Sequence, residues 1–224
     1  MRKNLSVAII AIIIANIVSA QTIQPQVTRI GFFAGPVAGN MWEKVSGKSH
    51  MHDYVLGSTI GILLDVPMQR FASFQPGVDY IGKNSKDSYT DNNGLIVHTK
   101  TTLSYLEVPM NVLFRIPNGS GKVTVGGGVA TAVAINGKEN TTVGTSTPEE
   151  KKLQFGDLAV DDYVRYDFGL NFLAGYQFQN GFFVTFNYNW GINRLFVGGD
   201  PKDKLYNNYI ALRAGFLLGG KKKK

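Results

Sequence analysis

Two histidines and an aspartate occur in the segment His50-Met51-His52-Asp53, where the imidazole nitrogens could bind a transition metal. Asp157, Asp161 and Asp162 offer carboxylates of the kind that bind calcium, but their spacing matches no EF-hand loop. Both groups lie in long polar stretches and lack an evident further ligand. We therefore expect solvated loops at these positions, and neither a metal nor another cofactor.

Catalytic patterns are equally sparse. Gly47-Lys48-Ser49 resembles the end of a phosphate-binding loop, but Trp42 stands where the first glycine is needed, and no strand–loop–helix pattern surrounds it. Gly126-Gly127-Gly128 lies inside a strand-like segment, where glycine makes room for a close neighbour. His98 with nearby Ser and Asp residues is the remaining candidate set, and the sequence supplies no geometry for it. We expect a protein that is not an enzyme.

Charged residues at regular positions give a stronger signal. Each lies on the polar side of a segment in which polar and apolar residues alternate: Arg29, Arg115, Arg165 and Arg213, with Asp65, Asp79, Glu107 and Asp167. Four positive and four negative groups can neutralise one another if the segments enclose them, whereas an unpaired buried charge costs several kcal/mol. The sequence predicts a structural ion network, with a gated ion pathway as the alternative.

The segments that must position these charges read as β-strands. Alternation is clearest over 164–178 and 182–192, where even positions are large and apolar and odd positions are mostly polar or small. Asn180-Gly181 between them is a tight hairpin signal. Six further segments show the same pattern with less clarity: 27–37, 54–66, 70–82, 97–116, 122–136 and 206–218. We therefore expect eight antiparallel strands.

The connections between these segments alternate in length. Short turns are expected near 67–69, 117–121 and 179–181, and long polar loops near 38–53, 83–96, 137–162 and 194–205. This alternation is typical of outer-membrane barrels, whose short turns face the periplasm. An even number of strands places both ends of the barrel on the periplasmic side.

The distribution of large side chains distinguishes a membrane barrel from a soluble cup. An eight-stranded barrel has a narrow interior that cannot hold many aromatic residues, so the apolar face must point outward, toward lipid. Aromatic residues also gather near the strand ends, as in the two interfacial girdles of membrane barrels: Tyr54, Tyr80, Tyr166 and Trp190 at one end, and Phe114, Tyr176, Phe178, Phe182 and Phe216 at the other. The fold class expected is all-β, an eight-stranded antiparallel transmembrane β-barrel surrounded by the lipid of a bacterial outer membrane.

The two ends of the chain are expected to lie outside the barrel. Residues 1–20 read as a cleaved signal peptide, with basic Arg2 and Lys3, an apolar run and the small-residue pattern Val18-Ser19-Ala20. A short periplasmic segment (21–26), the barrel (27–218) and a basic tail (219–224) would follow. Six basic residues lie at the ends, so the net charge of +7 falls to +1 between them, and no nucleic-acid partner is expected.

Several motifs together resemble a known family. The segment Tyr105-Leu106-Glu107-Val108-Pro109-Met110 is followed by Arg115 and by the glycine-rich Val123-Thr124-Val125-Gly126-Gly127-Gly128. With Asp167-Phe168-Gly169-Leu170 and Tyr188-Asn189-Trp190-Gly191, these blocks resemble the PorT-like outer-membrane β-barrel family of Bacteroidetes over about 27–218. The resemblance implies a barrel inserted by the barrel-assembly machinery, and it specifies no chemistry. The chain departs from the family after Phe216, where Leu217-Leu218-Gly219-Gly220 and four lysines follow.

The function expected from these observations is that of a non-enzymatic outer-membrane barrel with a lumen filled by side chains. Such a protein would be structural, or would bind a partner through its extracellular loops. The PorT-like family includes a component of type IX secretion and gliding, so an accessory subunit of an outer-membrane secretion or assembly machine is the alternative. A lipid-modifying enzyme or a narrow channel is a third hypothesis.

Overall fold

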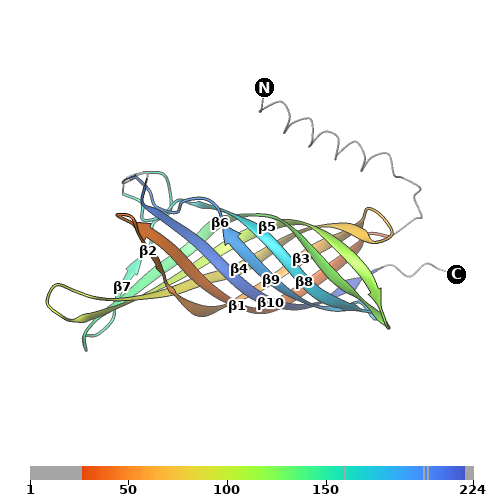
Figure 1. Cartoon of the computed structure of the whole chain (residues 1–224), viewed down its shortest axis with the longest axis horizontal. Coiled ribbons are helices and arrows are strands. Elements are labelled where there is room, and N and C mark those ends of the chain that lie inside the picture. Colours follow the sequence, from red (N-terminus) through yellow and green to blue (C-terminus); the bar gives the residue numbers. More distant parts are fainter. Residues whose placement is uncertain (1–26, 159, 199, 201, 220–224) are drawn as a thin grey trace, which may run out of the picture.

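The computed structural model describes residues 27–158, 160–198, 200 and 202–219 (Figure 1). The expected signal peptide, the segment 21–26 and residues 220–224 of the expected basic tail lie outside the described residues. Within the described part the chain forms strands: β1 (Arg29–Val45), β2 (Lys48–Met51), β3 (Asp53–Pro67), β4 (Ala72–Thr90), β5 (Ile96–Asn118), β6 (Gly121–Val143), β7 (Glu149–Lys152), β8 (Tyr166–Phe178), β9 (Phe182–Gly191) and β10 (Lys204–Leu218). No helix in these residues is long and apolar enough to cross a membrane.

Eight strands of the described part close into a ring. Their order is β1-β3-β4-β5-β6-β8-β9-β10, every neighbouring pair is antiparallel, and β10 returns to pair with β1 from Ile30 opposite Leu218 to Lys44 opposite Lys204. The two short strands lie outside this ring, with β2 paired to β1 and β7 paired to β6. The strands run obliquely to the long axis, and the short turns gather at one end (Figure 1). The expected all-β, eight-stranded antiparallel barrel is confirmed.

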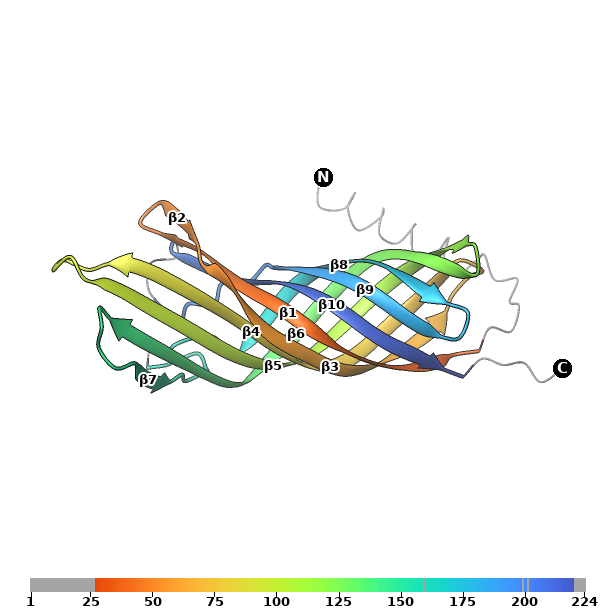
Figure 2. The same cartoon turned by 90° about the horizontal axis from the view of Figure 1, so that it is seen from below.

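Several strands are longer than the alternation pattern predicted. β1 continues to Val45, β4 to Thr90 and β6 to Val143, so much of the sequence expected in long loops is paired sheet. The backbone ladder persists there, for example between Thr101 and Glu139, although apolar and polar residues no longer alternate. Both faces of the sheet are polar once the strands have left the lipid. Figure 2 shows β4, β5 and β6 extending past the rest of the barrel at the extracellular end.

Two turns show why particular residues are needed. Ser46 (φ 50°) and Gly47 (φ 79°) form a two-residue hairpin turn between β1 and β2, with positive φ at both positions as a type I′ turn requires. The apparent phosphate-loop residues Lys48 and Ser49 therefore begin a strand. At the opposite end, Gly181 (φ 90°) lies in the Asn180-Gly181 turn that the sequence predicted.

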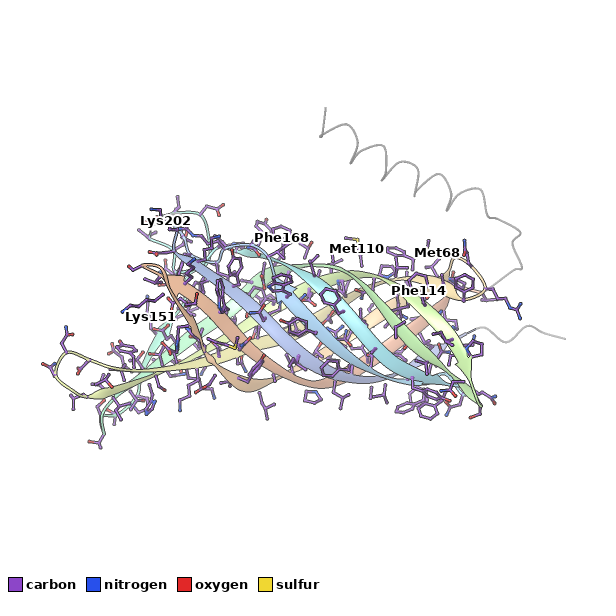
Figure 3. The ribbon with its side chains drawn as sticks, in the orientation of Figure 1. Met68, Met110, Phe114, Lys151, Phe168 and Lys202 are labelled. Carbon is purple, nitrogen blue, oxygen red and sulfur yellow. The ribbon has the colours of Figure 1, made fainter. Side chains whose placement is uncertain are left out.

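The outward face of the barrel is an apolar belt. Phe168, Phe172 and Phe186 are 41–51% exposed, whereas Asp167 and Asn171 on the opposite parity are at most 2% exposed. Phe168, Met110, Phe114 and Met68 follow one side of the barrel from the loop end to the turn end (Figure 3). At the periplasmic rim the rings of Tyr176, Phe178, Phe182 and Phe216 contact one another in series, with centroids 4.8–5.5 Å apart. Such a surface is stable in lipid and unfavourable in water.

Because the apolar belt faces lipid, the loss of unfolding free energy caused by a charged substitution depends on the depth of that residue in the membrane. Phe172 is the central residue of β8, and Tyr166 is its first residue at the extracellular end. We expect Phe172→Arg to destabilise the barrel by roughly 2–4 kcal/mol and Tyr166→Arg by about 0–1 kcal/mol. Urea unfolding in lipid vesicles measures both values. Equal losses at the two positions would contradict the assigned position of the membrane.

Candidate functional site: the charged lumen

The periplasmic end of the lumen holds one buried carboxylate between two arginines. We call Arg29, Asp65, Arg115 and Lys122 the mouth cluster. Arg29 donates to Asp65 Oδ2 through Nε (3.0 Å) and Nη2 (2.7 Å), and Arg115 Nη2 donates to Asp65 Oδ1. Arg29 Nη2 also donates to Gln177 Oε1 at 3.2 Å. Asp65 is fully buried, so these bonds tie β1, β3, β5 and β8 together at the turn end.

The mouth cluster carries an excess of positive charge. Lys122 joins Arg29, Arg115 and Arg70 around a cavity of about 170 Å³ that opens at this end of the barrel. No acidic side chain lines this cavity among the described residues; Asp65 lies behind it, bound to both arginines. The mouth of the barrel therefore presents a positive potential to the periplasm.

A mixed layer separates the mouth cluster from the middle of the barrel. Phe33, Leu63, Phe183 and Leu217 form one apolar group in this layer. An amide ladder accompanies it, in which Asn189 Nδ2 donates to Asn171 Oδ1 (2.7 Å) and Asn171 Nδ2 donates to Asn111 Oδ1 (3.2 Å). The cavity at this level measures about 20 Å³, close to the space of a single water molecule.

The middle of the barrel contains five buried charged residues, which we call the central cluster: Asp79, Lys83, Glu107, Asp167 and Arg213. Lys83 Nζ lies 2.9 Å from both Glu107 Oε2 and Asp167 Oδ2. Arg213 Nη2 lies 3.1 Å from Asp79 Oδ2 and 3.8 Å from Glu107 Oε1. Their side chains are at most 5% exposed and come from β4, β5, β8 and β10, so the cluster links opposite walls of the ring.

Neutral groups complete the central cluster. Tyr209 donates its hydroxyl proton to Glu107 Oε1 (2.6 Å), and Thr59 donates to Asp79 Oδ2 (2.9 Å). The Lys83 ammonium lies 5.0 and 5.1 Å from the ring centroids of Tyr105 and Tyr209, within the range of a cation–π contact. Three carboxyl groups therefore face two cations, an imbalance opposite to that of the mouth cluster. Such an arrangement pairs buried charges from four strands, and the cluster presents no activated nucleophile.

An apolar cap closes the extracellular side of the central cluster. It contains Leu153 and Leu195, which come from the long connections before β8 and β10 and lie buried among strand residues that include Val37, Met41, Ile81, Leu103 and Leu205. Phe155, Tyr163, Val164 and Phe196 pack against this group. The cap separates the buried charges from the extracellular water.

The structure brings together seven of the eight charged residues that the sequence placed in the lumen: Arg29, Asp65, Asp79, Glu107, Arg115, Asp167 and Arg213. The prediction for Arg165 was wrong, because this residue lies outside the lumen. The first residue of β8 is Tyr166, so Arg165 precedes the strand; it is exposed, and its Nη2 donates to the Phe155 carbonyl (2.8 Å). Lys83 occupies the position facing Asp167. The sequence contains a signal for the inward position of Lys83, because the odd-numbered residues Asp79, Ile81 and Lys83 of β4 all point inward.

The other candidate residues lie on the extracellular extensions. His50 Nε2 lies 2.8 Å from Asp87 Oδ1, and the described residues contain no group of three or more side chains able to hold a metal. His98 Nδ1 lies 2.7 Å from Ser88 Oγ, a contact that joins the exposed faces of β4 and β5. Within the described chain no carboxylate orients the other ring nitrogen of His98, as a nucleophile–base–acid arrangement needs. Asp162 binds Lys151 and the Gln154 backbone N–H on the surface.

The contacts of the central cluster predict that Lys83 is needed for the stability of the barrel. Replacing Lys83 with Met keeps the aliphatic stem but leaves Glu107 and Asp167 buried without their shared cation, and breaking a buried pair in this way costs about 3–5 kcal/mol. The matched control is Lys138→Met, which removes the exposed ion pair with Glu150 and should cost about 0–1 kcal/mol. Urea unfolding in lipid vesicles compares the two, and equal stability would show that the cluster does not bear on folding. The double variant with Asp167→Asn should lose less than the sum of the single changes.

Comparisons with known proteins identify the family of this chain. Residues 20–197 match the family described as "Outer membrane protein beta-barrel domain", and no curated protein matches the chain. The solved structure of Ail from Yersinia pestis is 15% identical with a TM-score of 0.40, over 85% of this chain and 98% of that one. Neisserial surface protein A is 12% identical (TM-score 0.37; 83% and 96% covered), as is the N-terminal barrel of Pseudomonas aeruginosa OprF (0.31; 83% and 97%). The family match spans most of the chain, which therefore belongs to the outer membrane protein beta-barrel domain family and is a protein of the bacterial outer membrane.

Proposed function

We propose that this protein is a non-enzymatic outer-membrane barrel with a closed lumen, which binds a partner on the extracellular side through the extended sheet of β4, β5 and β6. Its lumen supports a structural role, because two charged clusters and an apolar cap fill it. Transport of solutes requires a continuous aqueous path. The surfaces that remain for function are therefore the outer wall and the extracellular extensions.

The extended sheet is the observation that carries the proposal. Beyond the apolar belt, four apolar residues at the extracellular ends of β4, β5 and β6 are 37–54% exposed: Tyr89, Leu95, Ile96 and Val143. Ile96 has the parity opposite to that of Tyr89 and Val143, so both faces of the tip carry apolar side chains. The ladder places Tyr89 opposite Val97 and Val97 opposite Val143, so these residues sit on a hydrogen-bonded framework. Apolar side chains held rigidly at the far end of an otherwise polar projection are typical of a protein-binding surface.

The resemblance to PorT-like proteins supports a finer proposal. The block from Tyr105 to Met110 lies on β5, and Glu107 and Pro109 within it point into the lumen and are buried. The block is thus explained by the barrel interior and carries no information about a secretion machine. We infer a PorT-like barrel from this block.

A closed lumen predicts that the barrel does not conduct ions. In planar bilayers the protein should show no stable single-channel steps, because eight strands leave an interior that side chains fill. A large porin reconstituted in the same way provides the positive control. Reproducible conductance from the purified barrel would refute the closed lumen.

The partner surface predicts a position-dependent cross-link. A photo-crosslinking amino acid at position 96, on the apolar tip, should give a discrete protein adduct in intact outer membranes. The same amino acid at position 152, on the exposed polar strand β7 at the same end of the barrel, should give none. Absence of an adduct at both 96 and 143, with normal amounts of folded barrel, would contradict partner binding through this sheet.

A further inference from the structure

An open groove lies on the outer wall of the barrel, at the extracellular end of the seam where β1 meets β10. It measures about 490 Å³, and we call it the seam groove. Its main lining residues are Trp42, Lys44, Trp190, Lys204 and Tyr206, from β1, β9 and β10. The seam groove lies apart from the lumen, because these residues have the outward parity of their strands.

The groove lies at the depth of the membrane interface. Along the seam, the pairs of outward parity run from Ala38–Ile210 through the buried pair Asn40–Asn208 to Trp42–Tyr206 and Lys44–Lys204. Successive outward residues on a strand are about 7 Å apart, so the surface changes from apolar to aromatic to cationic over a short distance. The rings of Trp42 and Tyr206 stack with centroids 5.5 Å apart. Aromatic residues of this kind mark the level of lipid headgroups.

The two lysines of the seam groove face each other directly. Lys44 lies directly opposite Lys204 in the ladder, and like charges directly opposite one another are destabilising. Within the described residues no acidic side chain forms an ion pair with either lysine. The adjacent Asp203 instead accepts the Ser46 backbone N–H through Oδ1 (3.0 Å). An anion supplied from outside the protein would relieve this repulsion.

We propose that the seam groove binds the anionic, phosphate-bearing headgroup of a lipid in the outer leaflet, in preference to a zwitterionic headgroup. Lys44 and Lys204 donate hydrogen bonds to the phosphate oxygens, an interaction in which the ammonium acts as a point charge. Trp42, Tyr206 and Trp190 form the walls at headgroup depth, and the acyl chains continue along the apolar surface of Tyr188 and Ile210. This site is independent of the extended sheet proposed to bind a partner.

A second pair of lysines provides a matched control. Lys86 on β4 lies directly opposite Lys100 on β5, in the same kind of antiparallel pair. The neighbouring pair there is Asn84–Thr102, which supplies no aromatic wall, and Asp53 lies opposite Lys86 on the other side. This pair tests whether a facing pair of lysines on the extracellular part of the barrel is by itself enough to produce the lipid preference.

The tryptophans allow a direct measurement. The chain has two tryptophans, Trp42 and Trp190, and both line the seam groove. The folded protein is reconstituted in phosphatidylcholine vesicles with increasing fractions of brominated phosphatidic acid or, separately, brominated phosphatidylcholine, both of which quench tryptophan fluorescence. We expect phosphatidic acid to associate at least about fivefold more strongly, which is the effect of one lysine near an anionic surface.

Three double variants decide the outcome. Lys44→Gln combined with Lys204→Gln should reduce the preference for phosphatidic acid to near unity, whereas Lys86→Gln combined with Lys100→Gln should leave it unchanged. Lys44→Arg combined with Lys204→Arg should retain it, which separates loss of charge from loss of fold. Inorganic phosphate in the buffer should not displace the lipid. Equal quenching by the two lipids in the unsubstituted protein, or equal losses in both glutamine variants, would overturn the proposal.

Discussion

Closure of the backbone ladder between β1 and β10 is the constraint on which the rest of this structure depends. In hydrocarbon an unsatisfied N–H or C=O group costs several kcal/mol, so a sheet can cross a membrane only if it has no free edge. The ladder from Ile30–Leu218 to Lys44–Lys204, interrupted at Gly35 and Pro36, removes that edge. Closing the ring with eight strands also sets a narrow interior, and this narrowness determines which residues can point inward.

The narrow interior explains why charge in the lumen is both paired and segregated. The mouth cluster has more cations than carboxylates, the central cluster has more carboxylates than cations, and a thin layer of amides and apolar side chains lies between them. Opposite excesses along one axis attract each other more strongly in a dry interior than in water. Six of the eight strands contribute a charged residue whose partner is on another strand, as Asp65 does with Arg29 and Arg115, so the charges also resist slippage of the register.

Alternation along single strands was sufficient to predict much of the lumen, because parity alone decides which face a residue occupies. It identified Asp65, Asp79, Glu107 and Asp167 correctly as inward residues. The prediction failed where a strand remains hydrogen-bonded although its apolar and polar residues no longer alternate. Lys83 was assigned to a loop although its strand continues to Thr90, since polar residues on both faces conceal the strand period outside the lipid. Arg165 shows the opposite error. It has the inward parity and was therefore placed in the lumen, but β8 begins only at the next residue, Tyr166.

Partners across the lumen and along the seam could not be predicted, for a geometric reason. Which inward residues meet depends on the tilt and stagger of the closed sheet, and these are properties of all eight strands together. The seam groove shows this most clearly, because Trp42 and Tyr206 stack although almost the whole barrel sequence separates them. No motif spacing connects Lys44 to Lys204, and only ring closure makes them neighbours. In a barrel whose interior is filled, closure therefore both seals the lumen and creates, on the outer wall, a binding surface that neither end of the chain contains alone.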